Sequence, residues 1–96
     1  MIRGLRTLPL RIQRIAATTT KVLAFPENHA KVRKVYSPRA TGNAQFALTE
    51  QQLHGASGLV TIELDAADVP AVERFCDSLR RFLITVSWGS YESLLF

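Results

Sequence analysis

The sequence predicts an α+β fold, with helices packed on a short antiparallel or mixed sheet. Apolar residues recur at helical spacing in residues 1–25 and 65–82, whereas short runs rich in β-branched residues lie at 31–38, 58–64 and 83–87. No segment is repeated. The 96 residues, 47% of them hydrophobic and 21% charged, are typical of one globular domain. The predicted order is helix, strand, strand, helix, strand.

The first 25 residues predict an amphipathic helix. Pro9 suits its first turn, where the missing N–H would have no partner anyway, and residues 26–28 (Pro-Glu-Asn) break it. The apolar stripe consists of Leu8, Ile12, Ile15 and Val22.

The same segment has the composition of a mitochondrial presequence, because it is rich in Arg and Thr and contains no acid. A surface helix explains the composition equally well, so both interpretations stay open. Its basic residues are Arg3, Arg6, Arg11, Arg14 and Lys21.

Two strands are predicted in the middle of the chain. "KVRKVYSP" (31–38) alternates apolar and charged residues and ends at a proline, which suits a strand with a charged edge. Residues 39–50 are polar and turn-prone. "GLVTIEL" (58–64) is rich in β-branched residues and predicts a central strand.

A second helix is predicted over residues 65–82, with Asp65 or Asp68 as its N-cap. Cys76 is interpreted as a small core residue of this helix, and "LITVS" (83–87) as the last strand. The predicted apolar face consists of Val72, Phe75, Cys76, Leu79 and either Phe82 or Leu83.

Charge is distributed unevenly. Residues 1–39 contain nine Lys/Arg and one acid, whereas residues 40–96 contain three Arg and seven acids. A basic half is compatible with nucleic acid, an anionic membrane or an acidic partner subunit. We expect no nucleic-acid partner, because few aromatic residues accompany these cations, and no membrane partner, because no apolar run approaches the roughly 20 residues that span a bilayer.

The residues alone predict no catalytic constellation and no metal site. His29 and His54 lie in turn-like segments without a neighbouring cysteine or carboxylate at ligand spacing, so we expect exposed side chains. "HGASG" precedes a strand rather than a helix, so Gly55 and Gly58 are interpreted as turn residues and not as a phosphate loop. Lys21 is expected to be solvated.

Four segments resemble the Cys/Met-metabolism family of pyridoxal-phosphate enzymes, in order and approximate spacing, over nearly the whole chain. They are "RGLRTLPLR" (3–11), "KVRKVYSP" (31–38), "HGASGLVTIEL" (54–64) and "SWGSYESLLF" (87–96). The resemblance implies the small C-terminal domain of a trans-sulfuration enzyme with the fold-type I transferase architecture, without its large cofactor domain. Residues 1–96 would be a single partial domain, with 1–25 as the inter-domain linking helix and 26–96 as the α+β segment.

The last of these segments is similar to the cystathionine β-lyase branch, since the γ-synthase and γ-lyase branches tend to carry Leu-Gly-Gly there. This implies a carbon–sulfur lyase of methionine biosynthesis that acts on an amino-acid thioether with pyridoxal phosphate. The family's Schiff-base Lys lies upstream of this sequence and its carboxylate-binding Arg lies beyond Phe96. We therefore expect a chain without catalytic or cofactor-binding residues, inactive alone, whose partners are the missing large domain or homologous subunits.

By the same resemblance, Ser87 and Trp88 form one wall of the substrate site, although Trp88 could instead be a core aromatic residue. Val86 and Ser90 depart from the family pattern, which puts the original substrate preference in doubt. The supporting loop would consist of Gly89, Tyr91, Glu92 and Ser93.

One alternative from another class stays open: a free-standing, non-catalytic α+β interaction module or remnant that binds an intact homologue or an acidic partner. The location expected is cytoplasmic, because the single Cys76 cannot form an internal disulfide. The mitochondrion is the alternative, from the Arg-rich N-terminal segment.

Overall fold

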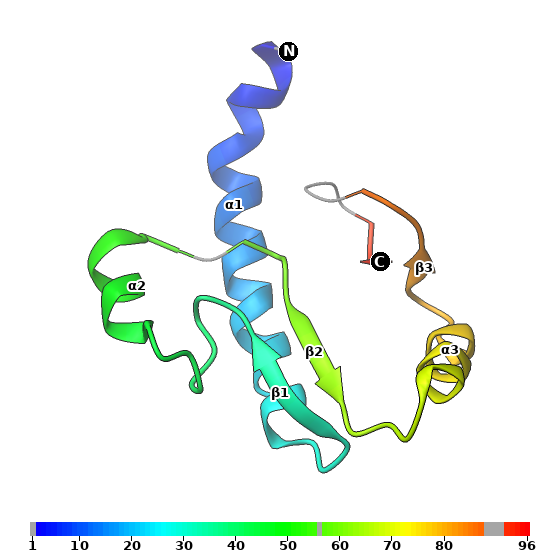
Figure 1. Cartoon of the computed structure of the whole chain (residues 1–96). Helices are drawn as coiled ribbons and strands as arrows, with labels where there is room; N and C mark the ends of the chain where they lie inside the picture. The colour runs from blue at the N-terminus through cyan, green and yellow to red at the C-terminus, as the bar shows by residue number, and fades with distance from the viewer. Residues whose placement is uncertain (1, 56, 88–91) are drawn as a thin grey trace. The chain divides into compact units, whose positions relative to one another are not determined.

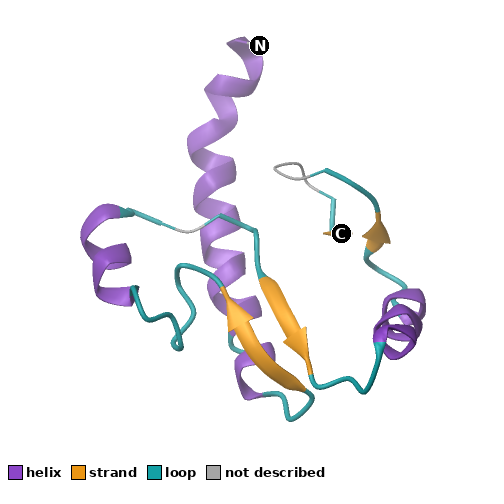
Figure 2. Cartoon of the chain, in the orientation of Figure 1, coloured by secondary structure: helices purple, strands orange, loops and turns teal. Residues whose placement is uncertain are grey.

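The computed structural model describes residues 2–55, 57–87 and 92–96. The chain divides into two compact units, Met1–Glu63 and Leu64–Phe96. Helices and short strands alternate along the chain (Figures 1 and 2), which confirms the α+β class. No helix in the described ranges is long and apolar enough to cross a membrane.

Unit 1 is built around a long N-terminal helix and a two-stranded sheet. Figure 2 shows the two strands of this sheet running in opposite directions. The elements are α1 (Ile2–Leu23), the 3-10 helix η1 (Pro26–Asn28), β1 (Val32–Tyr36), α2 (Phe46–Gln52) and β2 (Thr61–Leu64), whose last residue opens unit 2.

The buried side of α1 matches the predicted stripe only in part, because Leu8 and Ile15 are half-buried. Thr19 and Leu23 are buried, with Leu23 only 4% exposed, whereas Ile12 and Val22 are half exposed at 50% and 49%. The Thr19 hydroxyl donates a hydrogen bond to the carbonyl oxygen of Ser57 at 3.2 Å. The most buried side chains of the helix are thus Thr19 and Leu23, one turn apart, rather than Ile12 and Val22.

Pro9 lies inside α1 and not in its first turn, so that prediction was wrong. The helix begins earlier because the preceding residues include good helix formers, and one proline removes only one backbone N–H. Side chains bind the first turn: Thr7 Oγ1 and Arg11 Nη2 donate to the carbonyl oxygen of Gly4 at 3.3 and 3.1 Å.

Helix α2 occupies part of the segment predicted to be turn-prone. Turns do extend up to Gln45, but Phe46–Gln52 is helical. The sequence "FALTEQQ" contains good helix formers that the polar character of residues 39–50 concealed. The prediction was therefore wrong for the second half of this segment.

Unit 2 contains α3 (Val69–Ser78), whose N-cap is Asp68, one of the two residues predicted for that role. The Asp68 carboxylate accepts a hydrogen bond from the backbone N–H of Ala71 at 2.8 Å, a cap that typically contributes about 0.5–2 kcal/mol. Because α3 ends at Ser78, Phe82 and Leu83 lie beyond it and not on its apolar face. Of the predicted face, Cys76 is half-buried and no residue of α3 is buried.

The chain ends in a parallel pair of two-residue strands, β3 (Leu83–Ile84) and β4 (Leu94–Leu95). The backbone N–H of Leu83 donates to the Ser93 carbonyl at 3.0 Å, and that of Thr85 to the Leu95 carbonyl at 3.1 Å. The predicted last strand is thus shorter than expected, and β4 was not predicted.

Candidate functional site

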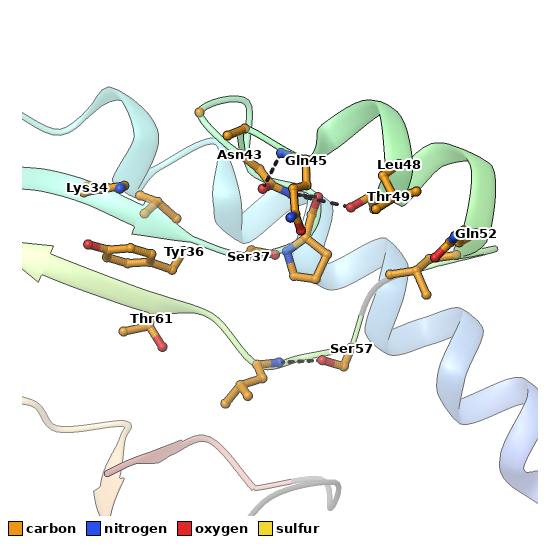
Figure 3. A pocket seen from close by; sticks show the side chains of 16 residues that line it. Lys34, Tyr36, Ser37, Asn43, Gln45, Leu48, Thr49, Gln52, Ser57 and Thr61 are labelled. Atoms are coloured by element: carbon orange, nitrogen blue, oxygen red, sulfur yellow. Dashed lines mark hydrogen bonds between the residues drawn. The ribbon is translucent and has the colours of Figure 1, made fainter.

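Unit 1 contains an open groove of about 790 Å³ between the end of β1, the loop 37–45, α2 and the residues before β2 (Figure 3). Its lining mixes hydroxyl and amide groups with aliphatic side chains. The polar lining residues are Lys34, Tyr36, Ser37, Asn43, Gln45, Thr49, Gln52, Ser57 and Thr61.

The loop 37–45 is held by Asn43, whose side chain uses both ends of its amide. Its Nδ2 donates to the Pro38 carbonyl at 2.9 Å and to Thr49 Oγ1 at 3.4 Å. Its Oδ1 accepts from the backbone N–H of Gln45 at 3.0 Å. This Asx turn leads directly into α2 and fixes one wall of the groove.

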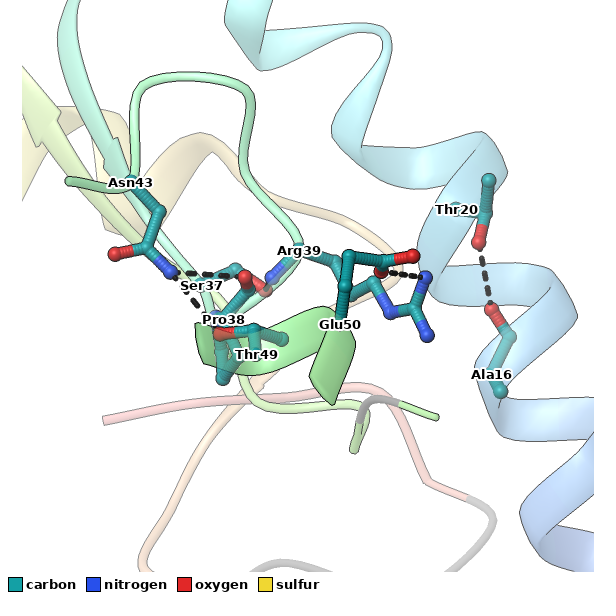
Figure 4. A network of polar contacts seen from close by, with 8 residues as sticks. All are labelled: Ala16, Thr20, Ser37, Pro38, Arg39, Asn43, Thr49 and Glu50. Carbon is teal, nitrogen blue, oxygen red and sulfur yellow. Dashed lines mark hydrogen bonds and ion pairs between the residues drawn. The ribbon is translucent and has the colours of Figure 1, made fainter. Parts of the chain in front are cut away.

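Charged residues tie the same loop to its neighbours (Figure 4). Arg39 Nη1 lies 2.7 Å from Glu50 Oε1 of α2, and the Arg39 side chain is partly buried. Glu27 Oε1 of η1 accepts from the backbone N–H of Thr41 at 2.7 Å and from its hydroxyl at 3.2 Å. The loop is therefore anchored to two helices.

Polar side chains join the two strands of the β1–β2 sheet. The Tyr36 hydroxyl donates to Glu63 Oε2 at 3.0 Å, and Arg33 Nη1 lies 3.5 Å from Glu63 Oε1. Lys34 Nζ lies 4.7 Å from the centroid of the Tyr36 ring, a cation–π contact. Glu63 thus joins β2 to two side chains of β1.

The groove offers hydrogen bonding and apolar packing, but its lining contains no carboxylate, histidine or cysteine. It therefore provides no nucleophile–base pair. Among the described residues, no three His, Cys, Asp or Glu side chains lie close enough together to hold a metal ion.

The predicted substrate residues, Ser87 and Trp88, belong to unit 2, whereas the groove residues belong to unit 1. Ser87 is exposed and follows β3 by three residues, and the preceding Val86 is 87% exposed. Trp88, Gly89, Ser90 and Tyr91 lie outside the described residues. The strand pair β3–β4 brings Leu83 beside Leu94 and Ile84 beside Leu95.

Other predicted positions are confirmed. His29 and His54 are exposed, and His29 Nδ1 accepts from the backbone N–H of Lys31 at 3.2 Å. Lys21 is exposed on α1. The groove residues were not predicted; the local signal that could have indicated them is the Asn two residues before Gln45, which is typical of an Asx turn.

Solved structures contain this fold as one part of a larger chain. A cystathionine gamma-lyase from Lactobacillus plantarum complexed with L-serine matches with a TM-score of 0.85 and 30% identity, over 96% of this chain and 24% of the solved one. A cystathionine gamma synthase from Xanthomonas oryzae pv. oryzae matches with a TM-score of 0.85 and 32% identity, over 94% and 23%. The fold therefore defines a class: a small α+β portion of a pyridoxal-phosphate-dependent enzyme.

Sequence comparison identifies the family within this class. The cystathionine gamma-synthase 1 of Arabidopsis thaliana is 35% identical over 95 residues, which are 99% of this chain and 17% of the relative. A cystathionine beta-lyase of Salmonella typhimurium is 33% identical over 94 residues, 97% of this chain and 24% of the relative. The family model for Cys/Met metabolism PLP-dependent enzymes matches residues 1–96, and the chain belongs to that family.

The chain spans about a quarter or less of the curated relatives it matches. The family description implies pyridoxal phosphate, yet the groove does not fit this cofactor. Lys34, the one lysine in its lining, packs on the Tyr36 ring, and the lining holds no carboxylate to pair with the pyridine nitrogen. No catalytic step is therefore assigned to the groove.

Proposed function

We propose that this chain is the small-domain part of a carbon–sulfur lyase of the cystathionine β-lyase type, active in trans-sulfuration and methionine biosynthesis. The observation that carries the proposal is the family match over the whole chain, together with a fold that covers only about a quarter of each solved relative. The matched relatives include γ-synthases, β-lyases and γ-lyases. The β-lyase assignment rests on the Ser-Trp-Gly-Ser-Tyr-Glu-Ser string of residues 87–93.

In this proposal Ser87 and Trp88 form one wall of the site for an amino-acid thioether. The serine hydroxyl would hold the polar end of the substrate, and the indole would pack beside its aliphatic part. The cofactor, when bound by the remainder of the enzyme, supplies the electron sink for elimination. The remaining catalytic groups, and any subunit partners, would come from outside these residues.

A chimaeric enzyme that contains this chain tests the proposed lyase function. We expect a Salmonella cystathionine beta-lyase whose matching segment is replaced by residues 1–96 to release a three-carbon keto acid from cystathionine, the product of β-elimination. In that chimaera Trp88→Ala should lower kcat/KM at least about tenfold, equivalent to ~1.4 kcal/mol. Steady-state assays of both keto acids give the measurement.

The matched control is Phe96→Ala, which changes an aromatic residue outside the proposed wall and should leave kcat/KM within about twofold. Cofactor absorbance verifies that each chimaera is loaded. A fully loaded chimaera that releases mainly the four-carbon keto acid would contradict the β-lyase assignment. Equal losses for both variants would contradict the role of Trp88.

The chain by itself should bind no pyridoxal phosphate covalently. The expected result after incubation with the cofactor and borohydride reduction is no specific adduct by mass spectrometry, because Lys21 and Lys31 are exposed and Lys34 lies on the Tyr36 ring, with no acidic partner in the described part of the chain. Intact beta-lyase serves as the positive control. A stoichiometric adduct mapped to any of the three lysines would overturn this expectation.

Cytoplasmic location is part of the same proposal, and the mitochondrion is its alternative because α1 is basic and contains no acid. Subcellular fractionation of cells that express a C-terminally tagged chain separates the two. Recovery of the tag inside mitochondria would exclude the cytoplasmic assignment.

A further inference from the structure

The open groove of unit 1 lies where the two strands of its sheet stop pairing. Strand β1 ends at Tyr36 and β2 begins at Thr61. Beyond these residues the loop 37–45 and the residues before β2 separate, and α2 joins them (Figures 1 and 3). Every described lining residue lies between Lys34 and Thr61, so the groove belongs to unit 1 alone.

The walls of the groove are held by hydrogen bonds within unit 1. Asn43 Nδ2 donates to Thr49 Oγ1 at 3.4 Å, and Ser57 Oγ accepts from the backbone N–H of Leu59 at 3.3 Å. The Tyr36 hydroxyl donates to a carboxylate of β2 at 3.0 Å. Walls that are arranged in advance lower the cost of ordering the site when a ligand binds.

Other polar side chains of the groove have no hydrogen-bond partner within the described part of the chain. They include the amides of Gln45 and Gln52 and the hydroxyl of Thr61, all of them exposed. A glutamine amide offers both donors and an acceptor. It can therefore bond to the N–H and the C=O of a peptide group.

Three leucines leave aliphatic surface open in the same groove. Leu48 lies on α2 and Leu53 follows its last residue, and both are 44% exposed. Leu59, before β2, is 48% exposed. Burial of this surface by an apolar side chain of a ligand would be favourable.

The charge of the groove and of unit 1 is positive. Lys34 is the charged side chain in the described lining, and it is exposed although its ammonium group lies over the Tyr36 ring. Residues 1–63 contain nine Lys/Arg and three Asp/Glu, which gives +6. The three carboxylates, Glu27, Glu50 and Glu63, already bond to groups of unit 1. Unit 1 therefore attracts an acidic ligand.

We propose that this groove binds an extended, acidic segment of a partner protein. A carboxylate of the segment would lie beside Lys34, an apolar side chain would lie among the three leucines, and peptide groups would bond to Gln45 and Gln52. Extended peptides are bound elsewhere by main-chain hydrogen bonds that give affinity and by contacts to alternate side chains that give specificity. Such binding uses unit 1 alone and does not depend on the lyase function.

Other ligands fit this groove less well. Single-stranded nucleic acid binds to aromatic platforms and several cations, whereas the described lining contains one tyrosine, whose ring Lys34 covers, and one lysine. A small-molecule site encloses most of its ligand, whereas this groove is open (Figure 3). An extended segment matches the groove in charge, in its unpaired amides and in its exposed aliphatic surface.

Fluorescence anisotropy of the full chain with a labelled peptide tests the proposal. The probe is fluorescein-labelled Leu-Thr-Leu-Asp-Asp amide, and its two counterparts replace both aspartates by lysine or both leucines by serine. We expect the probe to bind with a Kd at least about tenfold lower than either counterpart, because one lacks the carboxylates and the other lacks the apolar side chains.

A pair of lysine variants tests the charge contact. Lys34→Glu should raise the Kd of the probe at least about tenfold, because it places a like charge beside the carboxylates. The matched control is Lys31→Glu, which makes the same charge change on an exposed residue outside the lining, before the opposite end of β1. It should raise Kd less than about threefold, since salt screens a more distant charge. Circular dichroism verifies that both variants stay folded.

Proton–nitrogen correlation spectra locate the bound probe directly. The side-chain amide signals of Gln45 and Gln52 should shift during the titration, whereas that of Asn28, which donates to the Ala24 carbonyl at 2.8 Å, should not. Equal affinity for the probe and its lysine counterpart, equal effects of the two lysine variants, or unchanged glutamine signals at saturation would each overturn the proposal. Displacement of the probe by a single-stranded oligonucleotide would also overturn it, in favour of a nucleic-acid site.

Discussion

Leu23→Ala should lower the free energy of unfolding of unit 1 by about 2–5 kcal/mol, the range for truncating a buried leucine. Leu23 ends α1 at 4% exposure, and in the described part of the chain the other buried apolar residues are Ala40, at 1%, and Pro26. A core this small has few aliphatic side chains that could move into the cavity. The loss should therefore approach the stability of a small unit, typically ~5 kcal/mol or more.

Urea titration followed by circular dichroism at 222 nm measures this loss. Val22→Ala is the matched control, because it removes an aliphatic side chain from the same helical turn at 49% exposure. Its expected effect is below about 1 kcal/mol. Equal effects of the two substitutions would show that Leu23 is not the core residue of α1.

Val22 and Leu23 also show which features of the fold could be predicted from the sequence and which could not. Helical spacing located α1, but Val22 and Leu23 are both aliphatic, and periodicity alone chose the wrong one. Leu23 lies one helical turn from Thr19, whose hydroxyl donates to the Ser57 carbonyl 38 positions along the chain. A contact of that range leaves no local pattern.

Local signals succeeded where a single side chain determines the backbone. Asp68 was predicted as a cap, and its bond to the Ala71 N–H confirms it. In contrast, α2 and β4 were missed. Helix α2 has only seven residues, too few for apolar periodicity to stand out. The two residues of β4 are extended because they pair with β3.

The candidate site, like the fold, was predictable from the sequence only in part. The Asn43 turn is readable from adjacent residues, but the groove beside it needs Arg39 to meet Glu50 and Glu27 to meet Thr41. Those pairings depend on where α2 and η1 lie in the fold. The roles of Ser87 and Trp88 came from family resemblance and stay predictions.

Gly58→Val should destabilise unit 1 by about 1–3 kcal/mol, the range for overpacking. A Cβ at position 58 would lie 3.2 Å from Ile15 Cγ2, closer than ordinary van der Waals contact. Ile15 is β-branched and restricted in χ1 within a helix, so it cannot turn aside freely. The segment would have to move away from α1, which would weaken the hydrogen bond between Thr19 and Ser57.

Two further variants identify the cause when stability is measured by urea titration. Gly42→Val is the matched control, since nothing lies within 4 Å of its new Cβ, and it should change stability by less than about 1 kcal/mol. Ile15→Ala removes the opposing methyl group, so in the double variant the two losses should be less than additive. Strictly additive losses would mean that the added side chain does not meet Ile15.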